Sequence, residues 1–254
     1  MKTKAIILLT MFFTSCLVAA PTPSEVNAVL TKYANNPKGW SALNYAIEQK
    51  DFEAAMVLVD HVKDFNRIDG GVDAIHRVFI QALEPNPREI TEIEKTLIKK
   101  LVDVGAEINR RVLHGALRTP LTLALQLDAR DIVIYLLNHR ANPYIGYPLW
   151  DVIWKSDYEL AELLIRAGVD LNFRDKSMPS APLIAAISRG DIKMVHLFLK
   201  NKANPNTCIK SMHNNLSPPI PALNFALMKC ESDPSNPARA EIVDLLIQYG
   251  AKLT

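Results

Sequence analysis

The amino-acid sequence predicts an all-α fold, a solenoid of about six helix–turn–helix repeats with a capping helix at the N-terminal end. Three observations lead to this prediction. The 254 residues have an ordinary globular composition, 49% hydrophobic and 22% charged. Two short phrases recur along residues 37–254, and their separation is constant in four of six copies. Because one unit of this size cannot bury its own apolar face, its neighbours must stack on it.

Residues 1–15 are typical of an export signal. Lys2 and Lys4 form a short positive segment in front of the apolar run Ala5–Phe13. A run of nine residues suits the core of a signal peptide and is too short for a bilayer, which needs about 20 residues. Removing residues 1–15 deletes two lysines and no acids, so the formal net charge falls from +2 to zero.

Two cleavage sites compete. The stretch Phe13–Cys16 resembles a bacterial lipobox, in which the cysteine becomes the lipidated N-terminus, although that family usually has Leu where Phe13 stands. Ordinary signal peptidase would instead cut after Ala20. Leu17 behind the cysteine implies, by resemblance to bacterial lipoproteins, delivery to the outer membrane. We therefore expect a lipoprotein on the periplasmic face of the outer membrane, lipidated at Cys16, with a soluble periplasmic protein as the alternative.

Residues 16–36 are predicted to form a tether and the capping helix, which we expect over 24–33 with Ser24 as its N-cap. The six repeats follow at about 37–69, 70–112, 113–146, 147–176, 177–216 and 217–254. The last of them is expected to cap the array at its C-terminal end.

Each repeat is marked by two phrases. The phrase that ends a repeat reads LVDHVKDFN at 58–66, and its copies occupy 101–109, 136–144, 164–172, 198–206 and 246–254. The phrase that begins a repeat reads TPLTLA at 119–124, and its copies occupy 41–46, 147–150, 181–186 and 221–226, with a degenerate copy at 73–76.

The spacing of the phrases supports the repeat. Their leading apolar residues are 15 apart in four copies, namely Leu43 to Leu58, Leu121 to Leu136, Leu149 to Leu164 and Leu183 to Phe198. The distance is 26 in the second copy and 23 in the sixth. These two copies contain the polar, Pro-rich stretches 84–87 and 232–237, which predict surface insertions.

The pattern resembles the ankyrin repeat, whose signature is Thr-Pro-Leu-His-x-Ala over 33 residues. Thr119–Leu121 is the closest match to the beginning of that signature, and Gly105–Asn109 shows the Gly-Ala-x-x-Asn ending. The resemblance covers about residues 37–254. The turn glycine of the family is replaced in three copies, at Val62, Arg140 and Lys202. Leu149 follows Tyr144 by only five positions, so one hairpin finger is expected to be truncated there.

The helices follow from local rules. Apolar residues recur at helical spacing in the second half of each unit, as at Ile132, Val133 and Leu136. Prolines open three of the first helices, where a missing N–H costs little, at Pro120, Pro148 and Pro182.

The sequence does not point to an enzyme. The motifs G-x-S-x-G, H-E-x-x-H, G-x-G-x-x-G and the P-loop are absent. The six histidines are scattered, and His61 and His139 occupy the same position of the repeat, which predicts a structural role in the turn. No second pair at ligand spacing accompanies Cys208 and His213, so we expect no metal and no cofactor. The net charge is too small to suggest nucleic acid.

Cys208 and Cys230 remain if Cys16 is acylated. An exported chain meets oxidising conditions, so these two cysteines could pair and staple the connection between the fifth and sixth repeats. Two thiols are the equally weighted alternative, because sequence cannot supply the geometry that a disulfide needs.

By resemblance, an ankyrin array binds partners through its fingertips and the exposed ends of its first helices. The predicted partner-binding residues are Arg118, Gln126, Leu127, Trp150, Trp154, Lys155, Arg174, Asp175, Lys176, Ser188, Arg189, Met228 and Lys229, with Trp40 as a further fingertip. Trp154 is the strongest candidate, since Trp and Arg dominate interface hot spots. Core packing is the alternative for Trp150.

The predicted function is that of a protein-binding module in the bacterial envelope, acting as a monomer or in a 1:1 heterodimer. Family analogy and the export signal favour an immunity protein that neutralises a toxic effector, such as a phospholipase delivered by type VI secretion. The alternatives are a periplasmic scaffold or chaperone for an envelope enzyme, and a secreted effector that binds a host protein. The membrane would be touched only through the N-terminal lipid.

Overall fold

The computed structural model describes residues 20–114, 116–173, 180–209 and 218–253. The export signal, Cys16 and the predicted contact residues Arg174, Asp175 and Lys176 lie outside these ranges. The chain divides into two compact units, Met1–Ala141 and Asn142–Thr254, which are described separately. Within the described residues, no helix is both long and apolar enough to cross a membrane.

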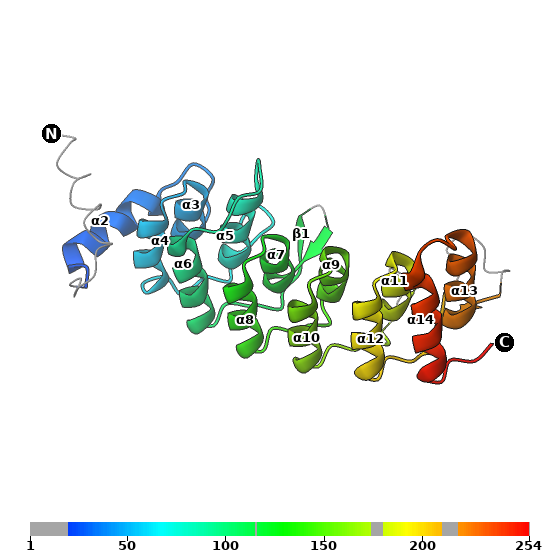
Figure 1. Cartoon of the computed structure of the whole chain (residues 1–254). Coiled ribbons are helices and arrows are strands. Elements are labelled where there is room, and N and C mark those ends of the chain that lie inside the picture. Colours follow the sequence, from blue (N-terminus) through cyan, green and yellow to red (C-terminus); the bar gives the residue numbers. More distant parts are fainter. Residues whose placement is uncertain (1–19, 115, 174–179, 210–217, 254) are drawn as a thin grey trace. The chain divides into compact units, whose positions relative to one another are not determined.

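The first unit contains the capping helix and three helix pairs (Figure 1). Its helices are α2 (Pro23–Ala34), α3 (Ala42–Glu48) with α4 (Phe52–Val59), α5 (Ala74–Leu83) with α6 (Glu92–Asp103), and α7 (Pro120–Gln126) with α8 (Arg130–Asn138). Strands β1 (Val112–His114) and β2 (Ala116–Arg118) form an antiparallel hairpin between the second and third pairs.

The second unit contains the other three helix pairs. They are α9 (Pro148–Lys155) with α10 (Tyr158–Arg166), α11 (Pro182–Arg189) with α12 (Ile192–Lys200), and α13 (Ala222–Ser232) with α14 (Pro237–Gln248). Strands β3 (Cys208–Ile209) and β4 (Ile220–Pro221) pair between α12 and α13. The linker between α8 and α9, residues 139–147, contains no strand, as expected of a truncated finger.

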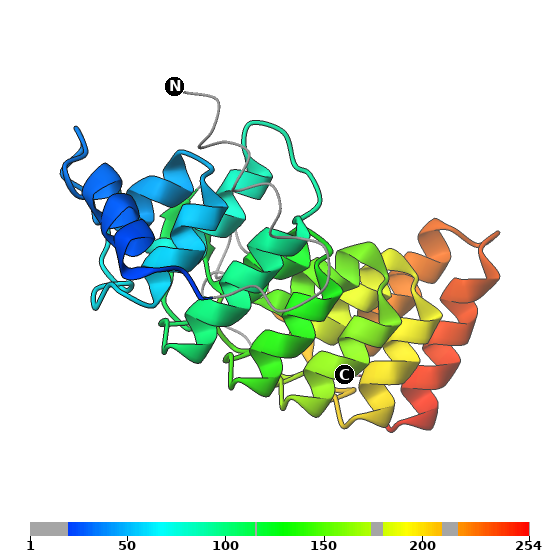
Figure 2. The same ribbon diagram turned by 90° about the vertical axis from the view of Figure 1, so that its left-hand side faces the viewer.

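Each unit has two layers. The first helices of successive pairs contact one another in one layer, and the second helices do so in the other. Figure 2 shows α10, α12 and α14 of the second unit side by side. The space between the layers is filled by apolar side chains, of which Phe79 in α5 and Phe198 in α12 are the largest fully buried ones. The predicted all-α repeat architecture is confirmed.

The N-cap of the capping helix lies two residues earlier than predicted. Thr22, not Ser24, is the N-cap, because Pro23 fits the first helical position and Glu25 completes a reciprocal capping box with Thr22. The helix is held to the first repeat by Asp51, the N-cap of α4, which accepts hydrogen bonds from Tyr33 and, at 2.8 Å, from the ammonium of Lys32. Burial alone would raise the pKa of Asp51, but these hydrogen bonds lower it below its ordinary value.

The two repeats that contain the predicted insertions also have longer helices. Helices α5 and α6 have 10 and 12 residues and α13 and α14 have 11 and 12, whereas the other repeat helices have 7 to 9. Residues 233–236 connect α13 to α14 and lie within the predicted stretch 232–237, while residues 84–91 connect α5 to α6 and include the predicted stretch 84–87. Pro237 does not prevent the extension, because it occupies the first turn of α14.

The last residue of the repeat phrase connects neighbouring repeats. The side-chain amide of Asn172 donates to the carbonyl of Lys202 at 3.4 Å and accepts from the amide of Asn204 at 2.7 Å. Asn66 and Asn206 make the same pair of bonds to the next turn. Tyr144 replaces the asparagine in the third copy, and its hydroxyl reaches the equivalent carbonyl of Gly168.

Asn172→Ala is therefore expected to lower the free energy of unfolding by about 1 to 2 kcal/mol, because two backbone hydrogen bonds are lost. Urea unfolding measures the change. Asn201→Ala is the matched control, since its amide bonds only to Leu197 in its own helix, and it should have a smaller effect. Equal losses in both variants would contradict a role in joining repeats.

The turn histidines behave as predicted. The Nδ1 of His61 lies 2.9 Å from the carbonyl oxygen of Val57, and that of His139 lies 2.8 Å from the carbonyl oxygen of Tyr135. Each ring thus closes the end of its own second helix. Tyr135 also bonds to Asp103, and partial burial together with that carboxylate raises the pKa of Tyr135 to about 12.

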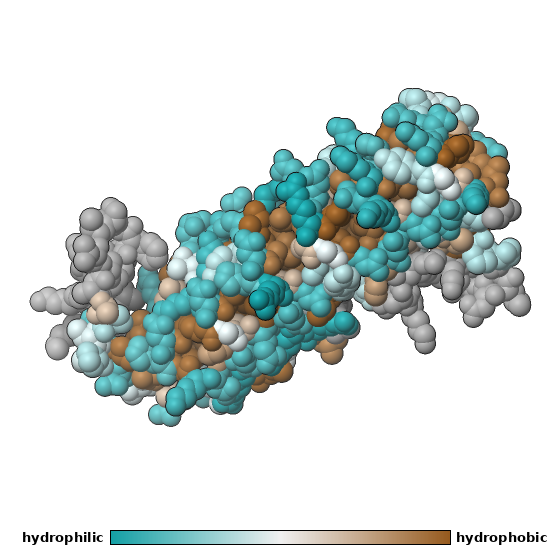
Figure 3. All heavy atoms as spheres, turned by 90° about the horizontal axis from the view of Figure 1, so that it is seen from below, coloured by the Kyte–Doolittle hydropathy of each residue, from teal (hydrophilic) through white to brown (hydrophobic). Residues whose placement is uncertain are grey.

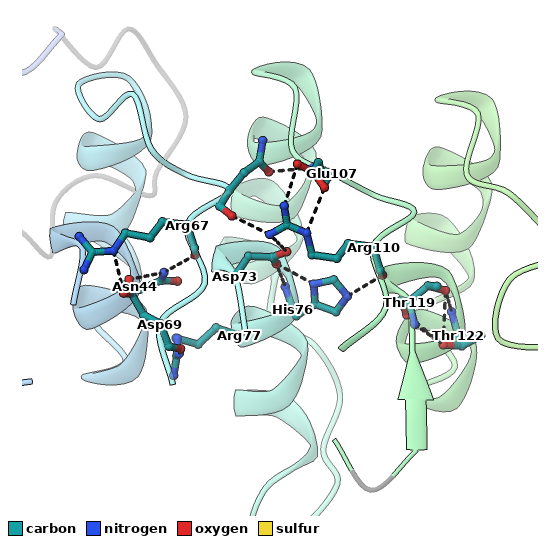
Figure 4. A network of polar contacts seen from close by, with 11 residues as sticks. Asn44, Arg67, Asp69, Asp73, His76, Arg77, Glu107, Arg110, Thr119 and Thr122 are labelled. Atoms are coloured by element: carbon teal, nitrogen blue, oxygen red, sulfur yellow. Dashed lines mark hydrogen bonds and ion pairs between the residues drawn. The ribbon is translucent and has the colours of Figure 1, made fainter. Parts of the chain in front are cut away.

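A polar network links the first two repeats of the first unit (Figure 4). Asp73 caps α5 and accepts from the Nδ1 of His76 at 2.6 Å, while both side chains are fully buried. Arg110 approaches Asp73 at 3.4 Å and donates to the carbonyl of Asn66 at 2.7 Å. The degenerate phrase at 73–76 therefore still performs the capping and bridging that the other copies perform.

No disulfide joins Cys208 and Cys230. Cys208 pairs with Pro221 across β3 and β4, which places it beside the beginning of α13. Cys230 lies nine residues further along, or about 13 Å at 1.5 Å per helical residue. A disulfide requires Cα atoms within about 7 Å, so the pairing considered from the sequence does not fit this geometry.

We expect alkylation to label both Cys208 and Cys230 in protein that has not been treated with a reductant. Intact mass spectrometry after iodoacetamide treatment in denaturant checks this. A protein that takes up label at these positions only after reduction would contain the disulfide.

Candidate protein-binding surface

Six of the predicted contact residues occupy equivalent positions on three adjacent first helices in the second unit, at the ends of α9 and α11 and in the second half of α13. Helix α11 contacts α9 on one side and α13 on the other. The residues are Trp154, Lys155, Ser188, Arg189, Met228 and Lys229, and we call this surface the α9–α11–α13 face. All are exposed except Lys229, which is half-buried.

Trp154 and Arg189 form the centre of the face. The Trp154 side chain is 64% exposed although it belongs to a helix whose opposite side is buried. The guanidinium of Arg189, from the next repeat, lies 4.9 Å from the centroid of the Trp154 ring. A stacked Arg–Trp pair presents a rigid apolar surface and a charge together, which is the chemistry typical of interface hot spots.

Ser156 holds Arg189 in place, and its role was not foreseen from the sequence. Its backbone is left-handed, with φ 53° and ψ 36°, at the C-cap of α9. The Ser156 hydroxyl donates to Asp191 at 2.9 Å and accepts from Arg189 at 3.4 Å. Aligning the repeats would have indicated the site, because Lys50, Asp128 and Gly190 stand at the same position with positive φ.

Asp191 fixes this arrangement to the scaffold. It is the N-cap of α12, where it accepts from the amide of Met194 at 3.0 Å. It also accepts from the hydroxyl of Tyr158 at 3.2 Å. Burial and the nearby Asp191 carboxylate raise the pKa of Tyr158, so the phenol stays a neutral donor.

The α13 side of the face combines a thioether with a cation. Met228 is 53% exposed, and the ammonium of Lys229 lies 5.4 Å from the centroid of the Phe225 ring. Arg239 reaches from α14 to the end of α11, where it donates to the carbonyls of Ile187 at 2.7 Å and Ser188 at 3.2 Å. This contact ties the end of α11 to the last helix pair.

Exposed apolar residues also occur elsewhere. Figure 3 shows hydrophobic residues in brown between hydrophilic ones in teal on the side seen from below. Exposure alone therefore does not single out the α9–α11–α13 face. The combination of an exposed aromatic ring, a stacked cation and a supporting hydrogen-bond network does.

Comparison with known proteins agrees with this architecture. The family model described as Ankyrin repeat matches residues 180–210. An ankyrin repeat domain from Acinetobacter baumannii AYE superposes with a TM-score of 0.63 at 22% identity, covering 83% of this chain and 98% of that one. The chain has the ankyrin-repeat fold.

Two further ankyrin structures are similar. The ankyrin repeat domain of Bcl-3, of the IkappaB protein family, gives a TM-score of 0.59 at 22% identity over 85% of this chain and 88% of that one. The human ASB11 ankyrin repeat domain gives 0.54 at 21% identity over 85% and 86%. Among curated proteins, none matches significantly. Ankyrin repeats are generally protein-binding modules, so a protein partner is the class of ligand that this fold serves.

Trp150 precedes Trp154 by four residues in α9, and it lines a pocket with residues outside the six of the α9–α11–α13 face. It is half-buried in a small pocket of about 20 Å³, which it lines with Tyr144, Tyr147, Phe173 and three prolines. The rings of Tyr147 and Phe173 are 5.9 Å apart, so the pocket is a packed aromatic cluster. Packing, which was the alternative considered for Trp150, describes its surroundings better than a place on the α9–α11–α13 face.

The remaining predicted contacts lie in the first unit. Arg118 is half-buried in β2, Gln126 is exposed at the end of α7, and Leu127 is the C-cap of that helix. Trp40 is not an open fingertip. The cations of Lys38 and Arg77 lie 4.2 and 4.1 Å from its ring centroid.

Gly70 is packed against the same ring. A Cβ at Gly70 would come within 2.6 Å of the Trp40 ring. Trp40 therefore belongs to the packing of the first unit.

The described residues contain no group of three or more His, Cys, Asp or Glu side chains arranged to hold a metal ion.

Proposed function

We propose that this chain is an immunity protein of the bacterial envelope that binds a toxic effector protein and neutralises it. One observation carries the proposal. The α9–α11–α13 face presents Trp154, 64% exposed and stacked with Arg189, on three rigid first helices. An aromatic anchor of this kind is best used by covering it with another protein.

Neutralisation requires a binder whose surface is preorganised. Arg189 is already held by Trp154 and Ser156, so little side-chain freedom is lost when a partner covers it. Preorganisation of this kind supports the tight, one-to-one binding that an inhibitor needs. We propose a phospholipase-type effector of type VI secretion as the partner, by analogy with exported ankyrin arrays.

We further propose that the chain acts at the periplasmic face of the outer membrane. The apolar leader and the Phe13–Cys16 stretch support export and lipidation. Cells grown with labelled palmitate should yield a labelled protein, and Cys16→Ala should abolish the label. Label that persists in Cys16→Ala would reject lipidation, and an unlabelled protein released with the periplasm would indicate cleavage after Ala20.

The immunity role is tested by competition between siblings. A strain that lacks the chain should be killed by the parent strain and rescued by the wild-type gene but not by Trp154→Ala. Purification from the envelope of the parent should recover an effector with lipase activity. A resistant deletion strain would overturn the proposal. Recovery of a resident envelope enzyme would favour a scaffold or chaperone, and recovery of host proteins alone would favour a secreted effector.

A further inference from the structure

We infer that the segment of the partner bound by the α9–α11–α13 face is acidic, with apolar side chains between its carboxylates. Its carboxylates lie on Arg189 and Lys229, and its apolar groups lie on Trp154 and Met228. This inference rests on the proposed function only in that the partner is a protein.

The first observation is the position of the basic residues. A cation stands six residues after the leading leucine in all three repeats of the second unit, at Lys155, Arg189 and Lys229. The equivalent positions of the first unit hold Gln49, Gln81 and Leu127. Adjacent repeats place equivalent residues side by side, so the second unit carries a row of cations that the first unit lacks.

The second observation is how Arg189 and Lys229 are supported. Each lies against an aromatic ring, Trp154 at 4.9 Å and Phe225 at 5.4 Å. Within the described residues, neither forms an ion pair with a carboxylate. An aromatic ring attracts a cation without accepting conventional hydrogen bonds from all of the cation's N–H groups. A guanidinium has five N–H donors. Among the side chains that the structure describes, Ser156 alone accepts from Arg189, so donors remain for a bidentate carboxylate.

The third observation is the apolar groups between the cations. Trp154 is 64% and Met228 is 53% exposed, and they flank Ser188 of the middle helix. A small residue between two large ones leaves space for a side chain of the partner. Met is adaptable, so it can fit an aliphatic or an aromatic group.

A protein segment explains this surface better than a nucleic acid does. The mature chain has no net charge, and screening limits exposed charges to about 8 Å at physiological salt. Attraction therefore has to come from groups in direct contact. A nucleic acid would need a broader basic surface than one row of three cations.

The inference is tested with short peptides and the full mature chain. The probe is a fluorescein-labelled 12-residue peptide of alternating Glu or Asp and Leu or Trp. Its amide counterpart has Gln and Asn in place of the acids, and a 12-nucleotide single-stranded DNA of the same label is the third probe. Fluorescence polarisation should show that the acidic peptide binds at least about 10-fold more tightly than the other two, one favourable ion pair being worth that factor.

Charge reversal locates the contact. Arg189→Glu with Lys229→Glu should weaken binding of the acidic peptide at least 10-fold and remove its dependence on salt. Lys200→Glu is the matched control, because Lys200, like Arg189, is an exposed cation in the last turn of its helix, α12. This control should leave binding unchanged. Circular dichroism should show the same helix content in all variants.

Three results would overturn the inference: equal binding of the acidic and amide peptides, preference for DNA, or no peptide binding at all. The experiments distinguish failure of this inference from failure of the proposed function. If Trp154→Ala abolishes immunity while the peptides show no preference for acid, the function stands and the inference is wrong. If the deletion strain is resistant while charge reversal abolishes acidic binding, the inference stands and the immunity role is wrong.

Discussion

Trp154→Ala is expected to weaken binding of the protein partner by at least about 2 kcal/mol, which is roughly a 30-fold increase in Kd. The side chain is 64% exposed in the free protein, so a partner that covers it buries this exposed apolar area. The truncation also removes the surface on which the Arg189 guanidinium rests at 4.9 Å. Calorimetric titration of the purified effector into each variant measures the change.

Two further variants test whether the loss of binding comes from the Trp154 ring itself or from a general change in the protein. Ile247→Ala removes a 55% exposed apolar side chain from α14, a second helix, and should leave Kd unchanged. Ser156→Ala keeps Trp154 but frees Arg189 from its hydrogen bond, and it should weaken binding by a smaller amount, about 1 kcal/mol. A Kd that Trp154→Ala does not alter would reject the α9–α11–α13 face as the site.

The repeat architecture was predictable because its signals are local and periodic. Pro120, Pro148 and Pro182 each open a helix, as the missing N–H allows. The constant spacing of 15 residues then places a second helix behind each first one. These features depend on residues close together in the chain, and so one sequence was enough to give them.

The sequence predictions failed for residues whose surroundings are set by contacts with another repeat. Trp40 was read as a fingertip from its position alone, but Lys38 and Arg77 lie against it, and Arg77 belongs to the next repeat. Ser156 was not among the predicted site residues, although its link to Asp191 organises the binding face. Such pairings come from stacking, which the sequence pattern predicts in general but not residue by residue.

The insertion in the second repeat shows the same limit. Polar residues and prolines at 84–87 predict a surface insertion, and residues 84–89 are indeed exposed and non-helical. The sequence did not show that this segment is also anchored to the helix that follows it. Arg88 makes two ion-pair contacts with Glu94, at 2.8 and 2.6 Å, and the Glu94 side chain is completely buried. Thr91 completes the capping box of α6 with the same carboxylate.

Arg88→Ala is therefore expected to lower the free energy of unfolding by about 3 kcal/mol. Removing one partner of a buried pair leaves the other charge uncompensated, which typically costs 3–5 kcal/mol. The lower end applies because Arg88 itself is 38% exposed and Thr91 still donates to Glu94. The double variant Arg88→Ala with Glu94→Gln should recover part of the loss, since the buried charge is then gone.

The pH dependence of the free energy of unfolding provides an independent test of the Arg88–Glu94 pair. Burial would raise the pKa of Glu94, but hydrogen bonds from Arg88 and Thr91 outweigh it and lower the pKa below its ordinary value of 4.5. Between the lowered and the ordinary pKa, the unfolded chain binds more protons than the folded one, so stability rises with pH there. This contribution is fully present above pH 4.5 and is lost as the pH falls through the lowered value.

Urea unfolding at several pH values distinguishes the variants. The wild type should lose stability steadily below about pH 4.5, and Glu94→Gln should lose less over the same interval, because it has no carboxylate to protonate. Arg88→Ala should already show its loss of about 3 kcal/mol at pH 7. Wild-type stability for Arg88→Ala at pH 7 would mean that 84–91 is the loose surface loop that its composition suggests. The expected loss would establish that the insertion, rather than interrupting the array, braces its second repeat.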